Sequence, residues 1–181
     1  MTRLGITVDY SDDFATSASE VTDFERAGID VVAVAEAYSF DAVSRLGYLA
    51  AITERATLMS TILPIYSRTP ALLAMTAAGL DSVSGGRFEL GLGSSGAQVI
   101  EGFHGVPFSA PLGRQREIVE ICRSVWKRER LEHAGKNYTV PLPGGLGKPL
   151  KLINEPVRSS IPIALASLTP KAVEQTAESA D

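Results

Sequence analysis

Short apolar runs alternate with longer amphipathic segments along most of the chain. The segments between the runs repeat apolar residues at the spacing of one helical face. Five runs have the length of β-strands and lie at residues 4–8, 30–35, 56–63, 87–92 and 161–166. The run at 30–35 is apolar at nearly every position, which is typical of a parallel strand covered on both faces. The pattern predicts an α/β fold made of consecutive βα units.

Two of the helices have start signals. Ser17, followed three residues later by Glu20, predicts a capping box in the first helix. Thr69 and Pro70 predict the start of the third, because threonine can cap a helix and proline lacks only an N–H that would be unpaired there. The apolar residues that these helices should bury are Val21, Phe24 and Ala27 in the first, and Leu72, Leu73, Met75, Ala77, Leu80 and Val83 in the third.

The second half of the chain contains one irregular segment. Further helices are expected over residues 41–53, from about 97, over 114–128 and from 170 onwards. In the helix expected over residues 114–128, Cys122 lies on the apolar side and Glu117 on the polar side. Prolines and glycines recur from about 129 to 160, which indicates a loop with short hairpin-like pieces. We expect one domain over residues 1–181, with this excursion inserted in it.

Composition and charge exclude several classes of protein. The net charge is −4 at pH 7, whereas a nucleic-acid-binding protein would be expected to carry a basic surface. No apolar run approaches the ~20 residues of a membrane span. The single cysteine, Cys122, fits a reducing compartment, and a cytoplasmic location is expected. The two histidines, His104 and His133, lack metal-ligand spacing, so no metal site is expected.

The centre of the chain carries a family resemblance. Residues 67–96 read SRTPALLAMTAAGLDSVSGGRFELGLGSSG, and residues 101–107 read EGFHGVP. These segments resemble the luciferase-like flavin and deazaflavin oxidoreductases, most closely the branch that uses coenzyme F420. The resemblance extends from residue 3 to the end of the chain. It implies a (β/α)8 TIM barrel and a homodimer.

The length of the chain bears on this expectation. A complete barrel of this kind needs about 250 residues, and the sequence has 181 with five predicted strands. We therefore expect the N-terminal part of a barrel, truncated after about five βα units. A natural half-length protein is the less favoured alternative.

In a parallel barrel the reactive side chains lie at the carboxyl ends of the strands. Glu36 is the only carboxylate at the end of the second strand and is the candidate catalytic residue, for proton transfer or for hydrogen bonds to the ring of the cofactor. From the residues alone, a solvated carboxylate or a helix cap is an equally good interpretation. Ala37 stands where other members of the family can carry histidine, and it is expected to contact the cofactor.

Three further strand ends are expected to contact the cofactor. The resemblance implies a non-proline cis peptide at the end of the third strand, in a bulge that supports the ring. After the fourth strand, small residues let backbone N–H groups approach a cofactor closely, and a glutamine follows. The turn after the fifth strand is expected along the cofactor tail. The candidate cofactor-binding residues are Ala37, Ser60, Thr61, Ile62, Gly93, Ser94, Gln98, Ala166 and Ser167.

The function implied by the resemblance is hydride transfer between coenzyme F420 and a small organic substrate. One alternative keeps the fold and exchanges F420 for FMN, with oxygen insertion as the reaction. A second alternative, from a different class, is a noncatalytic fragment or cofactor-binding subunit whose open sheet edges need a partner or shielding. The sequence does not identify the substrate.

Overall fold

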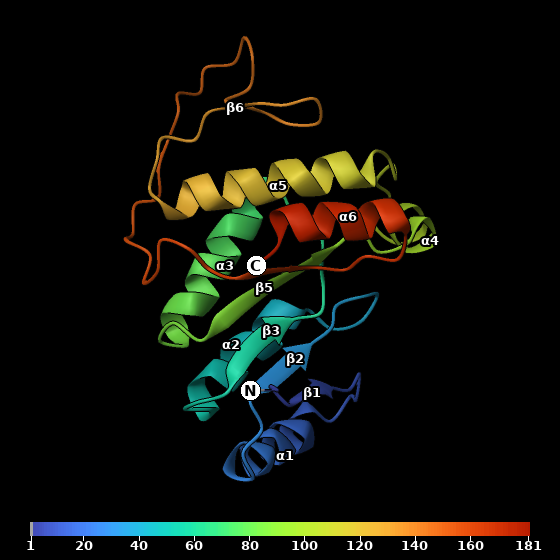
Figure 1. Ribbon diagram of the computed structural model, residues 1–181, viewed down its shortest axis with the longest axis vertical. Coiled ribbons are helices and arrows are strands. Elements are labelled where there is room, and N and C mark those ends of the chain that lie inside the picture. Colours follow the sequence, from blue (N-terminus) through green and yellow to red (C-terminus); the bar gives the residue numbers. More distant parts are fainter. Residues whose placement is uncertain (1) are drawn as a thin grey trace.

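A computed structural model describes residues 2–181, and a parallel sheet organises it (Figure 1). Strands β1, β2, β3 and β5 are neighbours in that order, β4 and β8 also pair with β5, and every one of these pairings is parallel. The sheet thus follows the predicted order of βα units. The strands are β1 (Gly5–Val8), β2 (Val31–Val34), β3 (Thr57–Ser60), β4 (Leu63–Pro64), β5 (Phe88–Gly93) and β8 (Ile163–Leu165).

The predicted third strand is divided into β3 and β4. Leu58 of β3 pairs with Phe88, and Leu63 of β4 pairs with Leu92. The register between these two pairs shifts by one residue, so the third strand contains one more residue than β5 over the same length. This is a β-bulge.

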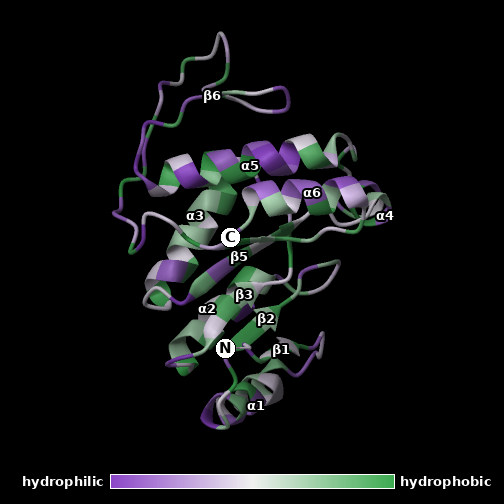
Figure 2. Ribbon diagram, in the orientation of Figure 1, coloured by the Kyte–Doolittle hydropathy of each residue, from purple (hydrophilic) through white to green (hydrophobic). Residues whose placement is uncertain are grey.

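Helices cover the sheet and bury its apolar residues in one core. Their polar residues, purple in Figure 2, run along α5 and α6, whereas the strands are largely green. The core includes Cys122, and burial raises the pKa of its thiol to about 12. No helix within residues 2–181 has both the length and the apolar character needed to cross a membrane. The helices are α1 (Phe14–Arg26), α2 (Ala42–Ile52), α3 (Pro70–Val83), α4 (Ala97–Gly102), α5 (Pro111–Trp126) and α6 (Pro170–Ser179).

The start predicted for the first helix is wrong. Asp13 is the N-cap of α1, and its carboxylate accepts a hydrogen bond from the backbone N–H of Thr16. Ser17 lies inside the helix and donates its hydroxyl to Asp9. The buried face of α1 is made by Ser17, Ala18, Val21 and Glu25. Phe24 and Ala27, which were predicted to be buried, are exposed.

The start predicted for the third helix is confirmed. The hydroxyl of Thr69 accepts a hydrogen bond from Leu72 N–H, and Pro70 is the first helical residue. The predicted buried face was too broad, because the sheet and α5 cover only a narrow side of α3. Leu73, Ala77 and Leu80 are buried, whereas Leu72, Met75 and Val83 are exposed.

The irregular segment contains a short hairpin, as predicted, but it also corrects the prediction for Glu117. Strands β6 (His133–Ala134) and β7 (Thr139–Val140) pair in an antiparallel manner. Glu117 on α5 was expected on the polar, exposed side of its helix. It is buried instead, because its carboxylate accepts hydrogen bonds from the hairpin turn at Lys136, Asn137 and Tyr138.

Candidate functional site

The carboxyl ends of the parallel strands lie at one edge of the sheet, on the right in Figure 1. The connection between β3 and β4 and the loops that follow β1, β2, β4, β5 and β8 therefore share this edge. All the candidate site residues of the sequence belong to these loops, to the strand ends or to the first turn of α4. Parallel topology alone brings these segments to one side of the molecule.

The bulge is built around a non-proline cis peptide between Thr61 and Ile62. Ser60 next to it is fully buried, and its hydroxyl donates to the carbonyl of Gly91 and accepts from Gly91 N–H, each at 2.9 Å. The Ser60 side chain thereby takes over hydrogen bonds that a regular ladder would make between backbone groups. Thr61 N–H donates to Val34 at 2.8 Å, so the bulge is held from both neighbouring strands.

Two glycines of β5 allow the bulge to approach. A Cβ added at Gly91 would lie 1.8 Å from the carbonyl oxygen of Ser60. A Cβ at Gly93 would lie 2.9 Å from Ile62 and 3.1 Å from Ala166. The structure therefore brings four of the candidate residues together, with Ile62 and Ala166 on either side of Gly93 and Ser60 beside Gly91.

One polar atom at the bulge has no hydrogen-bond partner within residues 2–181. It is Oγ1 of Thr61, which is buried. Buried hydroxyls are normally paired, and an unpaired one at a strand-end site is suited to a ligand. A small-residue wall beside an unsatisfied hydroxyl fits a flat ring with polar edges, so the residues present fit a flavin or deazaflavin.

The other predicted cofactor residues are less tightly grouped. Ser94 follows Gly93 directly, and its hydroxyl is 3.4 Å from the carbonyl of Ser95. Gln98 is exposed on the first turn of α4. Ser167 is turned into α6, where its hydroxyl donates to Ala172 at 3.2 Å and contacts the hydroxyl of Thr176.

Glu36 forms a bidentate ion pair with Arg68, the residue before the cap of α3. The guanidinium nitrogens of Arg68 lie 2.5 and 2.9 Å from the two carboxylate oxygens, and both side chains are largely buried. The hydrogen bond with Glu36 raises the pKa of Arg68 above its usual value. Glu36 also accepts the N–H of Ala42 at 3.0 Å, at the start of α2. Glu36 thus contacts the start of α2, whose N-cap is Asp41, and its catalytic role stays a prediction.

Arg68 extends the pair into a network. Its second nitrogen donates to Asp41, the N-cap of α2, at 2.8 Å. The loop after β2 is thereby fixed to the loop before α3. Arg68 was not among the predicted site residues, although its place four residues after the end of β4 was a usable signal.

Ala37 lines an open cleft of about 640 Å³ beside this network. The remaining lining residues come from the loops after β1 and β2 and are Tyr10, Asp12, Tyr38, Ser39 and Phe40. Residues 2–181 hold no group of three or more His, Cys, Asp or Glu side chains arranged for a metal ion.

The two histidines differ from each other in their contacts. Nε2 of His104 is buried without a hydrogen-bond partner, and its ring lies edge-on to Phe103 with centroids 5.3 Å apart. Nε2 of His133 is 3.3 Å from the carboxylate of Glu117, within the hairpin. His133 therefore serves the excursion and not the strand-end site.

Comparison with known proteins places this geometry in a family. The profile of the luciferase-like monooxygenases matches residues 1–181. The chain is similar to Rv3520c of Mycobacterium tuberculosis, a putative coenzyme F420-dependent oxidoreductase, at 46% identity over 162 residues. That match covers 87% of this chain and 47% of the relative. The chain thus spans about half the length of the relative it matches.

Two solved structures share the fold. The coenzyme F420-dependent tetrahydromethanopterin reductase from Methanopyrus kandleri matches with a TM-score of 0.87 and 22% identity, over 98% of this chain and 54% of that one. An F420-dependent secondary alcohol dehydrogenase in complex with an F420–acetone adduct matches with a TM-score of 0.86 and 20% identity, over 99% and 56%. The chain therefore belongs to the luciferase-like monooxygenase family, and its parallel sheet and alternating helices are those of the family's TIM barrel.

Proposed function

We propose that the chain carries the cofactor-binding part of a coenzyme F420-dependent oxidoreductase that acts on a small organic molecule. The observation that carries the proposal is the strand-end bulge, where Thr61 has a buried, unpaired hydroxyl and the next residue, Ile62, packs closely against Gly93. The 46% identity to a relative described as a putative F420-dependent oxidoreductase favours F420 over FMN.

Each candidate residue has a role in this proposal. Ser60, Thr61 and Ile62 would support one face of the ring, with the Thr61 hydroxyl as its polar contact. Gly93 lets Ile62 and Ala166 pack closely against β5, because a Cβ there would lie 2.9 Å from Ile62 and 3.1 Å from Ala166. The remaining candidates would contact the ring edge and the cofactor tail, and they are Ala37, Ser94, Gln98, Ala166 and Ser167.

The chemistry divides between cofactor and protein. A deazaflavin bound at this edge supplies hydride transfer at its C5 atom, which the protein side chains cannot provide. The chain's own residues bind and orient the reactants, and apolar groups such as Ile62 exclude water. Glu36 would act by holding Arg68 and the start of α2 in place, since both of its oxygens already accept hydrogen bonds.

A fluorescence titration with F420 and with FMN at matched concentrations tests the proposal. We expect this chain to bind F420 in preference to FMN. Gly93→Val should weaken F420 binding at least tenfold, because the added side chain would displace Ile62 and Ala166, two of the residues proposed to contact the cofactor. Gly47→Ala on α2 is the control, since a Cβ there meets no atom within 4 Å. Preference for FMN would favour a monooxygenase, and binding of neither would contradict the proposal for these residues.

Two further expectations belong to this proposal. The family resemblance supports a homodimer, and the single cysteine, which is free, supports a cytoplasmic location. Sedimentation equilibrium over a tenfold range of concentration measures the first. A mass that stays at that of one chain, 19.2 kDa, would exclude the dimer.

A further inference from the structure

Exposed aromatic rings surround the cleft at the strand ends. Tyr10, from the loop after β1, is 55% exposed, and Tyr38 and Phe40, from the loop after β2, are 70% and 60% exposed. Soluble proteins rarely leave large apolar groups gathered around a cavity of this size unless the groups contact a ligand. The walls of the cleft are thus suited to stacking against a ring.

A fourth ring continues the aromatic wall towards the candidate cofactor site. Phe103, the C-cap residue directly after α4, is 66% exposed, and its ring centroid is 6.3 Å from that of Tyr38. Helix α4 follows the turn that contains Ser94. Ala37 lines the cleft itself. The cleft is therefore adjacent to the residues proposed to bind the cofactor, as a substrate site must be.

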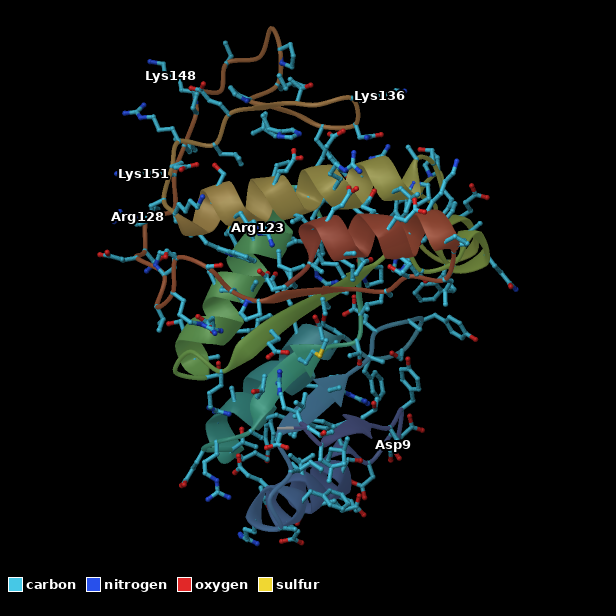
Figure 3. All side chains as sticks on the ribbon, in the orientation of Figure 1. Asp9, Arg123, Arg128, Lys136, Lys148 and Lys151 are labelled. Carbon is cyan, nitrogen blue, oxygen red and sulfur yellow. The ribbon has the colours of Figure 1, made fainter. Side chains whose placement is uncertain are left out.

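The charges around the cleft disfavour an anionic ligand. Asp12 is the only charged residue that the structure places in its lining. Arg68 is occupied by Glu36 and Asp41. Of the lysines of the excursion labelled in Figure 3, Lys148 and Lys151 lie at the upper left and Lys136 near the top, all well above Asp9. A phosphate or carboxylate in the cleft would meet the carboxylate of Asp12, whereas the guanidinium of the neighbouring Arg45 is 6% exposed and donates to backbone carbonyls.

Arg45 of α2 connects the two walls. It is 6% exposed, and its guanidinium donates to the carbonyls of Asp9 at 3.1 Å and Ser11 at 2.9 Å. The same group lies over the rings of Phe14 and Phe40, 5.1 and 5.4 Å from their centroids. It therefore contacts the backbone of one wall and an aromatic side chain of the other. A lysine has no planar fork and would not make all of these contacts.

We propose that this cleft binds an uncharged, ring-bearing organic molecule, and that Arg45 is a positioning residue that sets the distance between its walls. That the bound molecule is the substrate rests on the proposed oxidoreductase function. The chemical class of the ligand follows from the lining and its charge, and does not depend on that function.

Two related fluorescent probes test the ligand class. N-phenyl-1-naphthylamine is uncharged, and 8-anilinonaphthalene-1-sulfonate has the same ring system with an added sulfonate. We expect the uncharged probe to bind this chain with one-to-one stoichiometry and at least tenfold more tightly than the sulfonate. Equal affinities, or tighter binding of the sulfonate, would overturn the proposal.

Substitutions locate the probe. Tyr38→Ala and Phe40→Ala should each weaken binding of the uncharged probe about fivefold or more, because each removes an aromatic contact. Phe24→Ala is the matched control, since Phe24 is 46% exposed on α1 and lines a different cleft. A loss of binding in Phe24→Ala, with Tyr38→Ala and Phe40→Ala unchanged, would place the probe elsewhere and overturn the assignment.

The variant Arg45→Lys tests whether Arg45 positions the walls of the cleft or only stabilises the fold. We expect about a fivefold loss in affinity for the uncharged probe with an unchanged F420 titration, because the charge and the fold are kept while the wall contacts are lost. Equal losses for both ligands would show that Arg45 acts only on the fold. Binding of the probe without binding of F420 would support the proposed ligand class of the cleft and contradict the proposed oxidoreductase function. Binding of F420 without binding of the probe would support the proposed function and contradict the ligand class.

Discussion

Gly91 occupies a position where one methyl group decides whether the bulge can form. A Cβ there would lie 1.8 Å from the backbone oxygen of Ser60, far inside van der Waals contact. The neighbouring atom belongs to the backbone, so it cannot rotate away as a side chain would. Gly91→Ala should therefore lower the free energy of unfolding by about 2–4 kcal/mol, at or above the usual cost of overpacking a core. Urea unfolding followed by circular dichroism measures this change.

Gly79 in the middle of α3 is the matched control for Gly91. A Cβ there meets no atom within 4 Å, and the residue is exposed. Gly79→Ala should raise the free energy of unfolding by about 0.5–1 kcal/mol, because alanine loses less backbone entropy in a helix than glycine. If Gly91→Ala were as stable as Gly79→Ala, the close approach of β5 to the bulge would be wrong.

The residues that sequence reasoning placed correctly are those whose partners are close in the chain. Thr69 caps α3 through an N–H three residues away, which a local pattern can predict. Ser17 was misplaced because Asp13 offered an equally local cap, and no periodicity distinguishes the two. Arg68 was missed because its partner Glu36 is 32 positions away in the sequence.

At the scale of elements, the bounds of the strands were predicted within a few residues. The division of the third strand into β3 and β4 could not be predicted from its own residues. Nothing in Ser60, Thr61 or Ile62 indicates a bulge, and only the family resemblance implied the cis peptide. The hairpin of the excursion was predicted from prolines and glycines. Its attachment to α5 through Glu117 was not, because that contact joins residues about 20 positions apart.

Glu117 attaches the hairpin to α5. Its carboxylate accepts the N–H groups of Lys136 at 3.1 Å and Tyr138 at 2.8 Å and the side-chain amide of Asn137 at 2.7 Å. Glu117→Gln replaces one accepting oxygen by a donor, so the turn should open more often. We expect trypsin to cleave after Lys136 about tenfold faster in Glu117→Gln. Glu120→Gln, on the exposed side of the same helix, should leave the rate unchanged.

The same contact predicts how the hairpin responds to pH. Burial alone would raise the pKa of Glu117, but the hydrogen bonds from Asn137 and Tyr138 outweigh it and lower the pKa below its usual 4.5. A lowered folded-state pKa means that the stabilisation is complete above pH 4.5 and is lost as the pH falls through the folded value. Hydrogen exchange at Asn137 and Tyr138 should therefore lose protection only below pH 4.5. Loss of protection between pH 5 and 7 would contradict this assignment.

At the scale of the whole molecule, the order of strands follows from the βα alternation, whereas the closed barrel does not. The parallel pairings of β1, β2, β3, β5 and β8 agree with the predicted succession of units. Membership of a barrel came from the resemblance and is confirmed by the family match and the shared fold. Curvature of a sheet depends on contacts between strands far apart in the chain, so a local pattern of apolar residues does not specify it.

One ion pair joins three distant parts of this fold. Arg158, in the segment before β8, donates to both carboxylate oxygens of Asp81 near the end of α3, and to the carbonyl of Phe88 at the start of β5, at 2.6 Å. Asp81 is 1% exposed, so it depends on this partner. Arg158→Met should lower the free energy of unfolding by about 2–4 kcal/mol, because it leaves a buried carboxylate without its cation.

A double-mutant cycle with Asp81→Asn tests whether the loss comes from the uncompensated charge. Because asparagine removes that charge, the double variant should be more stable than Arg158→Met alone, and the two effects should not add. Arg128→Met is the control, since Arg128 pairs with the exposed Glu155 at 3.9 Å and should change the free energy of unfolding by less than about 0.5 kcal/mol. Urea unfolding at pH 7 measures all four variants. Additive losses in the cycle would show that Arg158 stabilises the fold by packing, and that the excursion is not held to α3 and β5 by charge.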